Sequence, residues 1–224
     1  MFGLGRYIVI VVAIALSGVA AWRLAMRWHP SVEHYPVQGI DVSEANGPID
    51  WAMVKGGGAD FGYAIATIGA TARDTMFQTN WDAMENAGIR RGAMHVYSLC
   101  QPATEQADLF NTTVPAPRDA LPAAVVVRYD DGCTARPDRA QLIHDLALFV
   151  RRIESHTRQP VLLKFDRAVE RDYRLSNGIK RNIWAVGNFL APGYAARPWR
   201  MWQASNIRRI DGIEGPVNWD VAVP

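Results

Sequence analysis

The most apolar stretch of the chain lies near its N-terminus, where residues 7–22 read YIVIVVAIALSGVAAW. Arg6 precedes this run, and Arg23 and Arg27 follow it. About 20 apolar helical residues span a bilayer, and the apolar residues between the two later arginines extend the run while the arginines reach the interface. The pattern therefore predicts a signal anchor within residues 1–28.

A cleaved signal peptide is the alternative interpretation of this segment. Arg6 would be its charged start, residues 8–16 its apolar core and residues 19–21, which are small, its cleavage site. Trp22 and Arg23 directly after that site disfavour cleavage. The charges on the two sides of the run are nearly balanced, so they do not set its orientation.

Short β-type runs alternate with amphipathic stretches along the rest of the chain. Residues 29–36 contain two prolines and no periodicity, which predicts a linker before one domain over residues 37–224. The predicted strands cover residues 37–42, 61–67, 92–97, 123–129, 160–165, 182–186, 199–204 and 217–221, and the clearest helical patterns cover residues 77–87, 104–110 and 139–155. This alternation predicts an α/β fold, an irregular TIM-like β/α barrel of about eight strands with functional residues at the strand carboxyl ends. The helical patterns become sparse towards the C-terminus, so we expect the last strands to be connected more directly.

The charge of the domain is close to neutral. The whole chain has a formal charge of +2, but without Arg6, Arg23 and Arg27 it has 21 basic and 22 acidic residues. The basic surplus belongs to the N-terminal segment, and the composition therefore does not favour a nucleic-acid partner.

The two cysteines, Cys100 and Cys133, form no C-x-x-C pair and have no histidine at metal-ligand spacing. Two cysteines in an exported domain usually pair, so we predict a disulfide between them, with two buried thiols as the alternative. We expect no metal site and no cofactor.

Several segments near the predicted strand ends have a recognisable form. The first strand reads GIDVS from Gly39 and is followed by NGPIDW from Asn46, and the third reads GAMHVY from Gly92. Later segments are Leu121-Pro122 before the fourth strand, Met201-Trp202-Gln203 in the seventh and Gly215-Pro216-Val217-Asn218 at the eighth. In this order they resemble glycoside hydrolase family 25, the lysozyme-type muramidases that cut the glycan strands of peptidoglycan. The resemblance implies a β/α barrel from about Val37 to the C-terminus, with its groove at the strand ends.

The resemblance also implies where the catalytic carboxylates belong. In the family, the fourth strand carries an Asp-x-Glu pair after Leu-Pro, and the strand period of two points both side chains into the groove. The matching positions here are Val126 and Arg128, and the family's usual aspartate on the eighth strand is Asn218. An arginine side chain stays protonated at every useful pH, so Arg128 cannot act as a general acid.

The second strand departs from the family as well, because its usual Lys-Ala-Thr-Glu-Gly is IATIG at residues 65–69. Charged groove positions are thus lost at several places while the scaffold motifs remain. We interpret the chain as a catalytically impaired member that binds peptidoglycan or a related glycan, or scaffolds an envelope assembly. The resemblance places the domain outside the cytoplasm, either anchored by the N-terminal segment or secreted after its cleavage.

Relocated carboxylates give the first alternative, an active muramidase. Asp41 matches the family's first-strand aspartate, and Asp220 lies two residues from Asn218 and hence on the same strand face. Asp130 and Asp131 follow the fourth strand directly, although D-D-G is also an ordinary turn sequence. Two of these groups at a hydrolytic separation would allow cleavage.

The second alternative is a module that binds a protein partner of the envelope. In that case Arg128 would be a groove cation that needs an acidic neighbour, for which Asp41 and Asp220 are the candidates.

The candidate sugar-binding residues come from strands three, six, seven and eight. His95 matches a family histidine and would line the groove, with a hydrogen-bonded core histidine as the alternative. Trp202 and Gln203 match a family motif. Aromatic rings stack on sugars but are more often core residues in strands. The aromatic candidates are Tyr97, Trp184, Trp202 and Trp219.

Overall fold

Eight strands close into a barrel in the computed structural model, which describes residues 2–130 and 132–223. The strands are β1 (Val37–Val42), β2 (Phe61–Ile68), β3 (Ala72–Arg73), β4 (Arg90–Tyr97), β5 (Ala124–Val127), β6 (Leu162–Phe165), β7 (Asn182–Val186), β8 (Met201–Arg208) and β9 (Val217–Ala222). The order is β1-β9-β8-β7-β6-β5-β4-β2, and β2 pairs again with β1 to close the ring. The short β3 pairs with β2. The predicted eight-stranded α/β barrel is confirmed.

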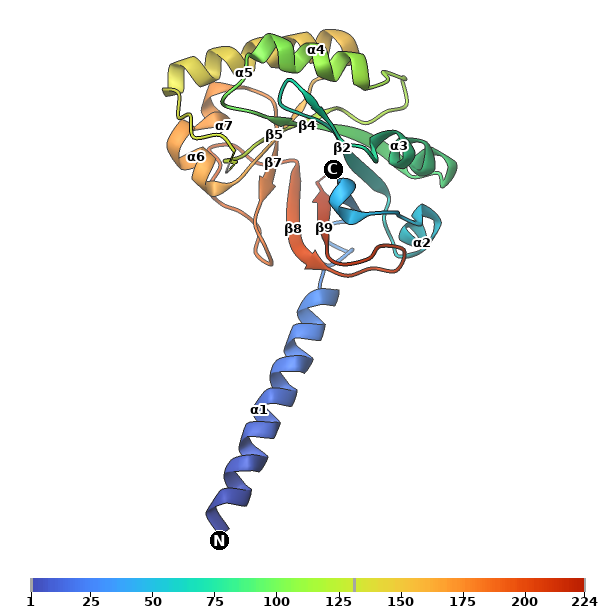
Figure 1. Cartoon of the computed structure of the whole chain (residues 1–224), viewed down its shortest axis with the longest axis vertical. Coiled ribbons are helices and arrows are strands. Elements are labelled where there is room, and N and C mark those ends of the chain that lie inside the picture. Colours follow the sequence, from blue (N-terminus) through green and yellow to red (C-terminus); the bar gives the residue numbers. More distant parts are fainter. Residues whose placement is uncertain (1, 131, 224) are drawn as a thin grey trace.

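The barrel is irregular because its last strand runs against its neighbours. β9 is antiparallel to both β8 and β1, while the other strands of the ring are parallel. The helices of the domain are η1 (Glu44–Asn46), α2 (Trp51–Gly56), α3 (Phe77–Asn86), α4 (Ala103–Thr113), α5 (Arg139–Thr157), α6 (Arg167–Tyr173) and α7 (Leu175–Gly178). Helices α4 and α5 pack side by side (Figure 1), and within the described residues no helix separates β7 from β8 or β8 from β9. The expected direct connections between the last strands are therefore present.

Side chains alternate between two apolar layers along each strand. One layer fills the barrel and includes Tyr63, Val96 and Trp184. The other lies between the strands and the helices, where Leu146 and Phe149 of α5 are fully buried. This alternation decides which strand residues reach the interior of the barrel and its open end.

The N-terminal helix α1 (Phe2–Arg27) projects away from the barrel (Figure 1). Its segment Gly5–Arg27 is long and apolar enough to cross a membrane, and none of its most apolar window is buried. A signal sequence has the same length and composition, so the helix agrees with both interpretations of the segment.

Residues 29–36, which we predicted to be a linker, lie against the barrel. The ring centroids of Tyr35 and Trp202 are 5.8 Å apart. The side-chain amide of Gln38 in β1 donates a hydrogen bond of 3.0 Å to the backbone carbonyl of Pro30, which is buried. The segment therefore covers β8 and β1 on the side of the barrel where helices are missing.

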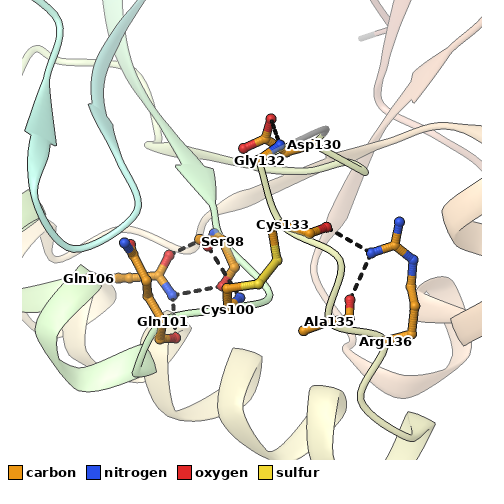
Figure 2. The surroundings of a disulfide bond; sticks show 9 residues. All are labelled: Ser98, Cys100, Gln101, Gln106, Asp130, Gly132, Cys133, Ala135 and Arg136. Atoms are coloured by element: carbon orange, nitrogen blue, oxygen red, sulfur yellow. Dashed lines mark hydrogen bonds between the residues drawn. A yellow bond between two sulfur atoms is a disulfide. The ribbon is translucent and has the colours of Figure 1, made fainter.

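A disulfide joins Cys100 to Cys133, which confirms the predicted pairing (Figure 2). It connects the loop after β4 to the loop after β5, beside the carboxyl ends of both strands. The β4 loop is held further by Gln106, whose amide donates hydrogen bonds of 2.9 Å to the carbonyls of Ser98 and Gln101.

We expect replacement of both cysteines by serine to lower the free energy of unfolding by roughly 3 to 4 kcal/mol, since the bond closes a loop over a sequence separation of 33. Urea unfolding of the variant, monitored by tryptophan fluorescence, measures this loss. Wild-type protein unfolded under a reductant should match the variant. A loss below 1 kcal/mol in both experiments would contradict the prediction.

Candidate functional site

A cleft of about 490 Å³ opens where the parallel strands end. Its floor and walls include residues of β1, β2, β4, β5, β6, β7, β8 and β9, so every strand of the ring contributes to it. The charged and polar residues that line it are Asp41, Ser43, Asn46, Arg128, Lys164, Asp166, Gln203, Asn206 and Asn218. This is the place at which β/α barrels hold their functional residues.

The positions at which the resemblance puts carboxylates all face this cleft. Val126 and Arg128 line it, as does Asn218. Arg128 is exposed, and its side chain makes no hydrogen bond or ion pair within the described residues. Asn218 donates a hydrogen bond of 3.0 Å from its side-chain nitrogen to Oδ1 of Asp41. The cleft therefore has a valine, an unpaired cation and an amide at the three positions where carboxylates were expected.

A buried ion pair between Asp41 and Lys164 forms part of the cleft floor. The ammonium of Lys164 contacts Oδ2 of Asp41, and the two side chains are only 4% and 7% exposed, respectively. The same ammonium lies 4.2 Å from the centre of the Trp184 ring. Asp41 thus has both carboxylate oxygens engaged, one by Lys164 and the other by Asn218.

Sequence reasoning missed Lys164, although a signal for it was present. It stands between Leu163 and Phe165, in a short run in which every other residue is apolar. A lysine in a wholly buried strand is rare unless it has a partner. A buried lysine at this position predicts an ion pair with one of the carboxylates inside the barrel.

Asp220 lies deeper in the barrel than the cleft floor. It pairs with Gly39 across the strands, whereas Asn218 pairs with Asp41 nearer the open end. Its side chain is fully buried, and its Oδ1 accepts a hydrogen bond of 3.0 Å from the Trp184 indole nitrogen.

Burial raises the pKa of Asp220 well above its ordinary value, and the nearby charge of Asp41 raises it further, while Lys164 opposes the shift. No donor within the described residues reaches its Oδ2 atom. Both observations fit a protonated carboxyl that donates its own hydrogen towards Asp41.

The other candidate acids that the structure describes are a helix cap and a turn residue. Asp166 lines the cleft, but its Oδ1 accepts a hydrogen bond of 2.9 Å from the backbone of Val169 and caps α6. Asp130 is exposed in a turn beside Cys133, outside the cleft lining, and Asp131 lies outside the described residues. Among residues 2–130 and 132–223, no group of three His, Cys, Asp or Glu side chains is placed to hold a metal ion.

Of the predicted sugar-binding residues, Gln203 lines the cleft and the aromatic ones do not. Trp184 is buried inside the barrel, and Trp202 and Trp219 are buried on its outer side. Tyr97 also lies in the outer layer, where its ring packs on Phe149 at 5.4 Å.

His95 is a fully buried residue of the same outer layer. Its Nδ1 lies 2.7 Å from the Thr67 hydroxyl and its Nε2 lies 3.1 Å from Oε1 of Gln106. Because that amide oxygen only accepts, Nε2 carries the hydrogen and Nδ1 accepts from Thr67, which assigns the neutral tautomer. Burial lowers the pKa of His95 to about 4.

This histidine is expected to make the fold sensitive to acid. The unfolded chain takes up a proton at about pH 6.5 and the folded chain only at about pH 4, so stability is lost as the pH falls between these values. The shift corresponds to about 3 kcal/mol. Urea unfolding across this range should show a smaller acid loss in His95→Gln than in wild type, while the exposed His144→Gln control should keep the wild-type slope. Equal slopes in all three proteins would contradict the assignment.

Comparison with known proteins agrees with the site geometry. The crystal structure of a lysozyme from Streptomyces coelicolor matches with a TM-score of 0.79 and 28% identity, over 84% of this chain and 92% of that one. A family 25 glycosyl hydrolase from Bacillus anthracis matches with a TM-score of 0.80 and 25% identity, over 88% and 93% of the two chains. The protein YegX of Escherichia coli K12 is 30% identical over 199 residues, which is 84% of this chain and 70% of YegX.

The motifs of the first, third and seventh predicted strands lie where that fold requires them, on β1, β4 and β8 around the cleft. The family model for glycosyl hydrolases family 25 matches residues 40–213, which includes Asp41, the cleft floor and the disulfide. The chain belongs to glycosyl hydrolases family 25.

Proposed function

We propose that this protein is a membrane-tethered, extracytoplasmic lysozyme-like module that binds peptidoglycan glycan without cleaving it. The observation that carries the proposal is an open cleft in which Val126, Arg128 and Asn218 occupy the positions expected for carboxylates. The scaffold and the cleft are retained, and the acid chemistry is missing.

Hydrolysis of a glycosidic bond needs two carboxyl groups on opposite sides of the scissile bond, about 5 to 9 Å apart. Asp41 is held in an ion pair by Lys164, and Asp166 caps a helix. Asp220 is buried beneath the floor and does not line the cleft. These placements leave no free pair of carboxyl groups within the described part of the cleft.

Glycan binding is supported by the polar side chains of the cleft. Ser43, Asn46, Gln203, Asn206 and Asn218 line it and provide hydroxyl and amide groups of the kind that hydrogen-bond to sugar hydroxyls. Apolar walls surround them, and about 490 Å³ is a usual size for a ligand site.

The tether is supported by α1, which is exposed along its apolar length. A lysozyme-like domain has its glycan outside the cytoplasm, so the barrel lies on the extracytoplasmic side and Arg6 on the inner side. If the helix is removed after Ala21 instead, the same domain is secreted.

Sedimentation with insoluble peptidoglycan tests the proposal, using the full chain in detergent micelles. We expect the protein to sediment without release of reducing ends. Gln203→Ala combined with Asn206→Ala should lower the bound fraction at least fivefold, because both side chains line the cleft. Gln141→Ala combined with Asn182→Ala, both on exposed positions elsewhere, is the matched control. Sedimentation that the cleft variant leaves unchanged would contradict glycan binding in the cleft.

Arg128 favours a second candidate, a protein-binding module. Neither Asp41 nor Asp220 pairs with its guanidinium, since Asp41 is in an ion pair with Lys164 and Asp220 is buried against Trp184. An exposed cation in a cleft accommodates a carboxylate from a partner protein. Failure of the chain to sediment with peptidoglycan would favour this function over glycan binding.

A further inference from the structure

Helix α1 is joined to the barrel by direct contacts. The backbone nitrogen of Arg209 donates a hydrogen bond of 2.8 Å to the carbonyl of Met26, and Arg208 reaches the carbonyl of Arg27 at 3.4 Å. Arg208 is itself buried, with its guanidinium 3.8 Å from the centre of the Trp219 ring. These contacts fix the end of α1 against the end of β8, so the barrel does not hang on a flexible tether.

A hollow of about 350 Å³ lies at this junction, between the last turns of α1 and the loop after β8. Arg23, Arg27 and Arg209 line it and are exposed, and none of their side chains has a carboxylate partner within the described residues. Asp211 is the one acidic residue of the lining. The hollow therefore has an excess of two positive charges.

The connection between β7 and β8 presents apolar side chains beside the same junction. Leu190 is 80% exposed and Phe189 is 39% exposed, and the Phe189 ring lies 5.2 Å from that of Trp28, next to the end of α1. In Figure 1 this connection extends on the side of the barrel from which α1 leaves. Aromatic and aliphatic side chains beside arginines are typical of protein segments at a membrane interface.

We propose that the hollow binds the phosphate headgroup of an anionic phospholipid, and that Phe189 and Leu190 enter the same leaflet. The inference rests on the proposed tether, in which α1 spans the bilayer. Arginine guanidinium groups bind phosphate oxygens through paired hydrogen bonds, and the unpaired charges of the hollow have no other ligand in the chain. The barrel then rests on the membrane at two points, the arginine hollow and the apolar loop.

This placement has a consequence for the cleft. Arg208 ends β8, at the same end of the strands as the cleft, and Asn206 of that strand lines the cleft. With Arg209 at the lipid headgroups, the cleft opens next to the membrane surface. The glycan that it meets is therefore the glycan nearest the membrane.

Depth measurements on a spin label test the proposal with the full chain in nanodiscs. Both native cysteines are in the disulfide, so a nitroxide reacts selectively with Leu190→Cys. In nanodiscs that contain phosphatidylglycerol, we expect the label to be more accessible to oxygen than to a water-soluble nickel chelate. In nanodiscs of phosphatidylcholine alone the label should return to water, and a label at Gln141→Cys should stay in water in both.

The arginines are tested by the triple substitution Arg23→Gln, Arg27→Gln and Arg209→Gln. Each arginine at an anionic surface contributes a factor of about five, so we expect the lipid-contacting population of the label to fall at least tenfold. The control removes three exposed positive charges elsewhere, by Arg118→Gln, Arg151→Gln and Lys180→Gln, and should leave that population unchanged.

Three results would overturn the proposal: a label at position 190 that stays in water with phosphatidylglycerol, equal effects of the two triple variants, or a mature chain that begins after Ala21. The first two results leave the proposed function intact, because peptidoglycan sedimentation measures glycan binding in the cleft and does not depend on lipid composition. The third result would remove the proposed tether as well, but not glycan binding by the secreted domain.

Discussion

The purified chain is expected to release reducing ends from peptidoglycan at least about 10⁴-fold more slowly than a family member with both carboxylates. Loss of general acid catalysis costs roughly 10² to 10⁴ in rate, and loss of the second carboxylate adds to it. The structure removes the obvious replacements, because Asp41 is paired with Lys164 and Asp220 is buried below the cleft. A change of pH does not supply the missing groups, so we expect no activity from about pH 3 to pH 9.

Muropeptide release, measured with an active lysozyme as reference, tests this expectation. Robust release of reducing ends that Asp41→Ala abolishes would contradict it and would identify an active muramidase with relocated carboxylates. Release that Asp41→Ala leaves unchanged would indicate a contaminating hydrolase.

A variant in which the two carboxylates are restored serves as the positive control for the same measurement. Val126 and Arg128 both line the cleft, so Val126→Asp with Arg128→Glu returns two carboxylates to its wall. We expect this variant to release reducing ends above the wild-type background, whereas Val126→Asn with Arg128→Gln, which has the same shapes without acids, should not. No gain in the acidic variant would contradict the assignment of the loss to these two positions.

The order of strands and helices followed from the sequence because each carries its own local pattern. The predicted strand 37–42 and the predicted strand 182–186 have the bounds of β1 and β7, and the helical pattern in residues 139–155 lies within α5 (Arg139–Thr157). The packing of residues 29–36 could not be predicted, because a segment with two prolines and no periodicity has the same pattern whether it is free or packed. Tyr35 of this segment packs on Trp202, which is far away in the sequence.

The hardest property of the site to predict was whether each strand side chain points into the barrel or towards the helices. Val96 pairs with Val126 between β4 and β5, and both face the barrel interior, so the neighbouring His95 and Tyr97 must face the helices. A shift of one residue in this assignment exchanges the two faces. The resemblance implied that the Val126 side chain faces the groove. Because Val96 lies beside Val126 on the neighbouring strand, it faces the same side, and the adjacent His95 therefore faces the outer layer.

Which charged side chains contact each other in the cleft could be identified only from the structure. For a protein-binding module, Asp41 and Asp220 were the expected neighbours of Arg128, but the cation that binds Asp41 is Lys164, which is 123 residues from it in the chain. Such a contact is set by the register between β1, β6 and their neighbours around the ring, and no local pattern reports it.

Removal of Lys164 is expected to destabilise the fold by roughly 3 to 5 kcal/mol, because Lys164→Met leaves the Asp41 carboxylate buried without its cation. Asp41→Leu should cost a similar amount, since it leaves the ammonium of Lys164 unpaired beside the Trp184 ring. Urea unfolding near neutral pH, with the chain in the same detergent for each variant, measures both losses.

The double variant Asp41→Leu with Lys164→Met separates a buried pair from two independent losses. Apolar residues that replace a whole buried ion pair are often neutral or stabilising, so the double variant should be more stable than either single variant. Additive losses would show that the two side chains act separately, and losses below 1 kcal/mol would show that water solvates the pair. In either of those cases the Asp41 carboxylate would be available to a substrate and would not be committed to stabilising the fold.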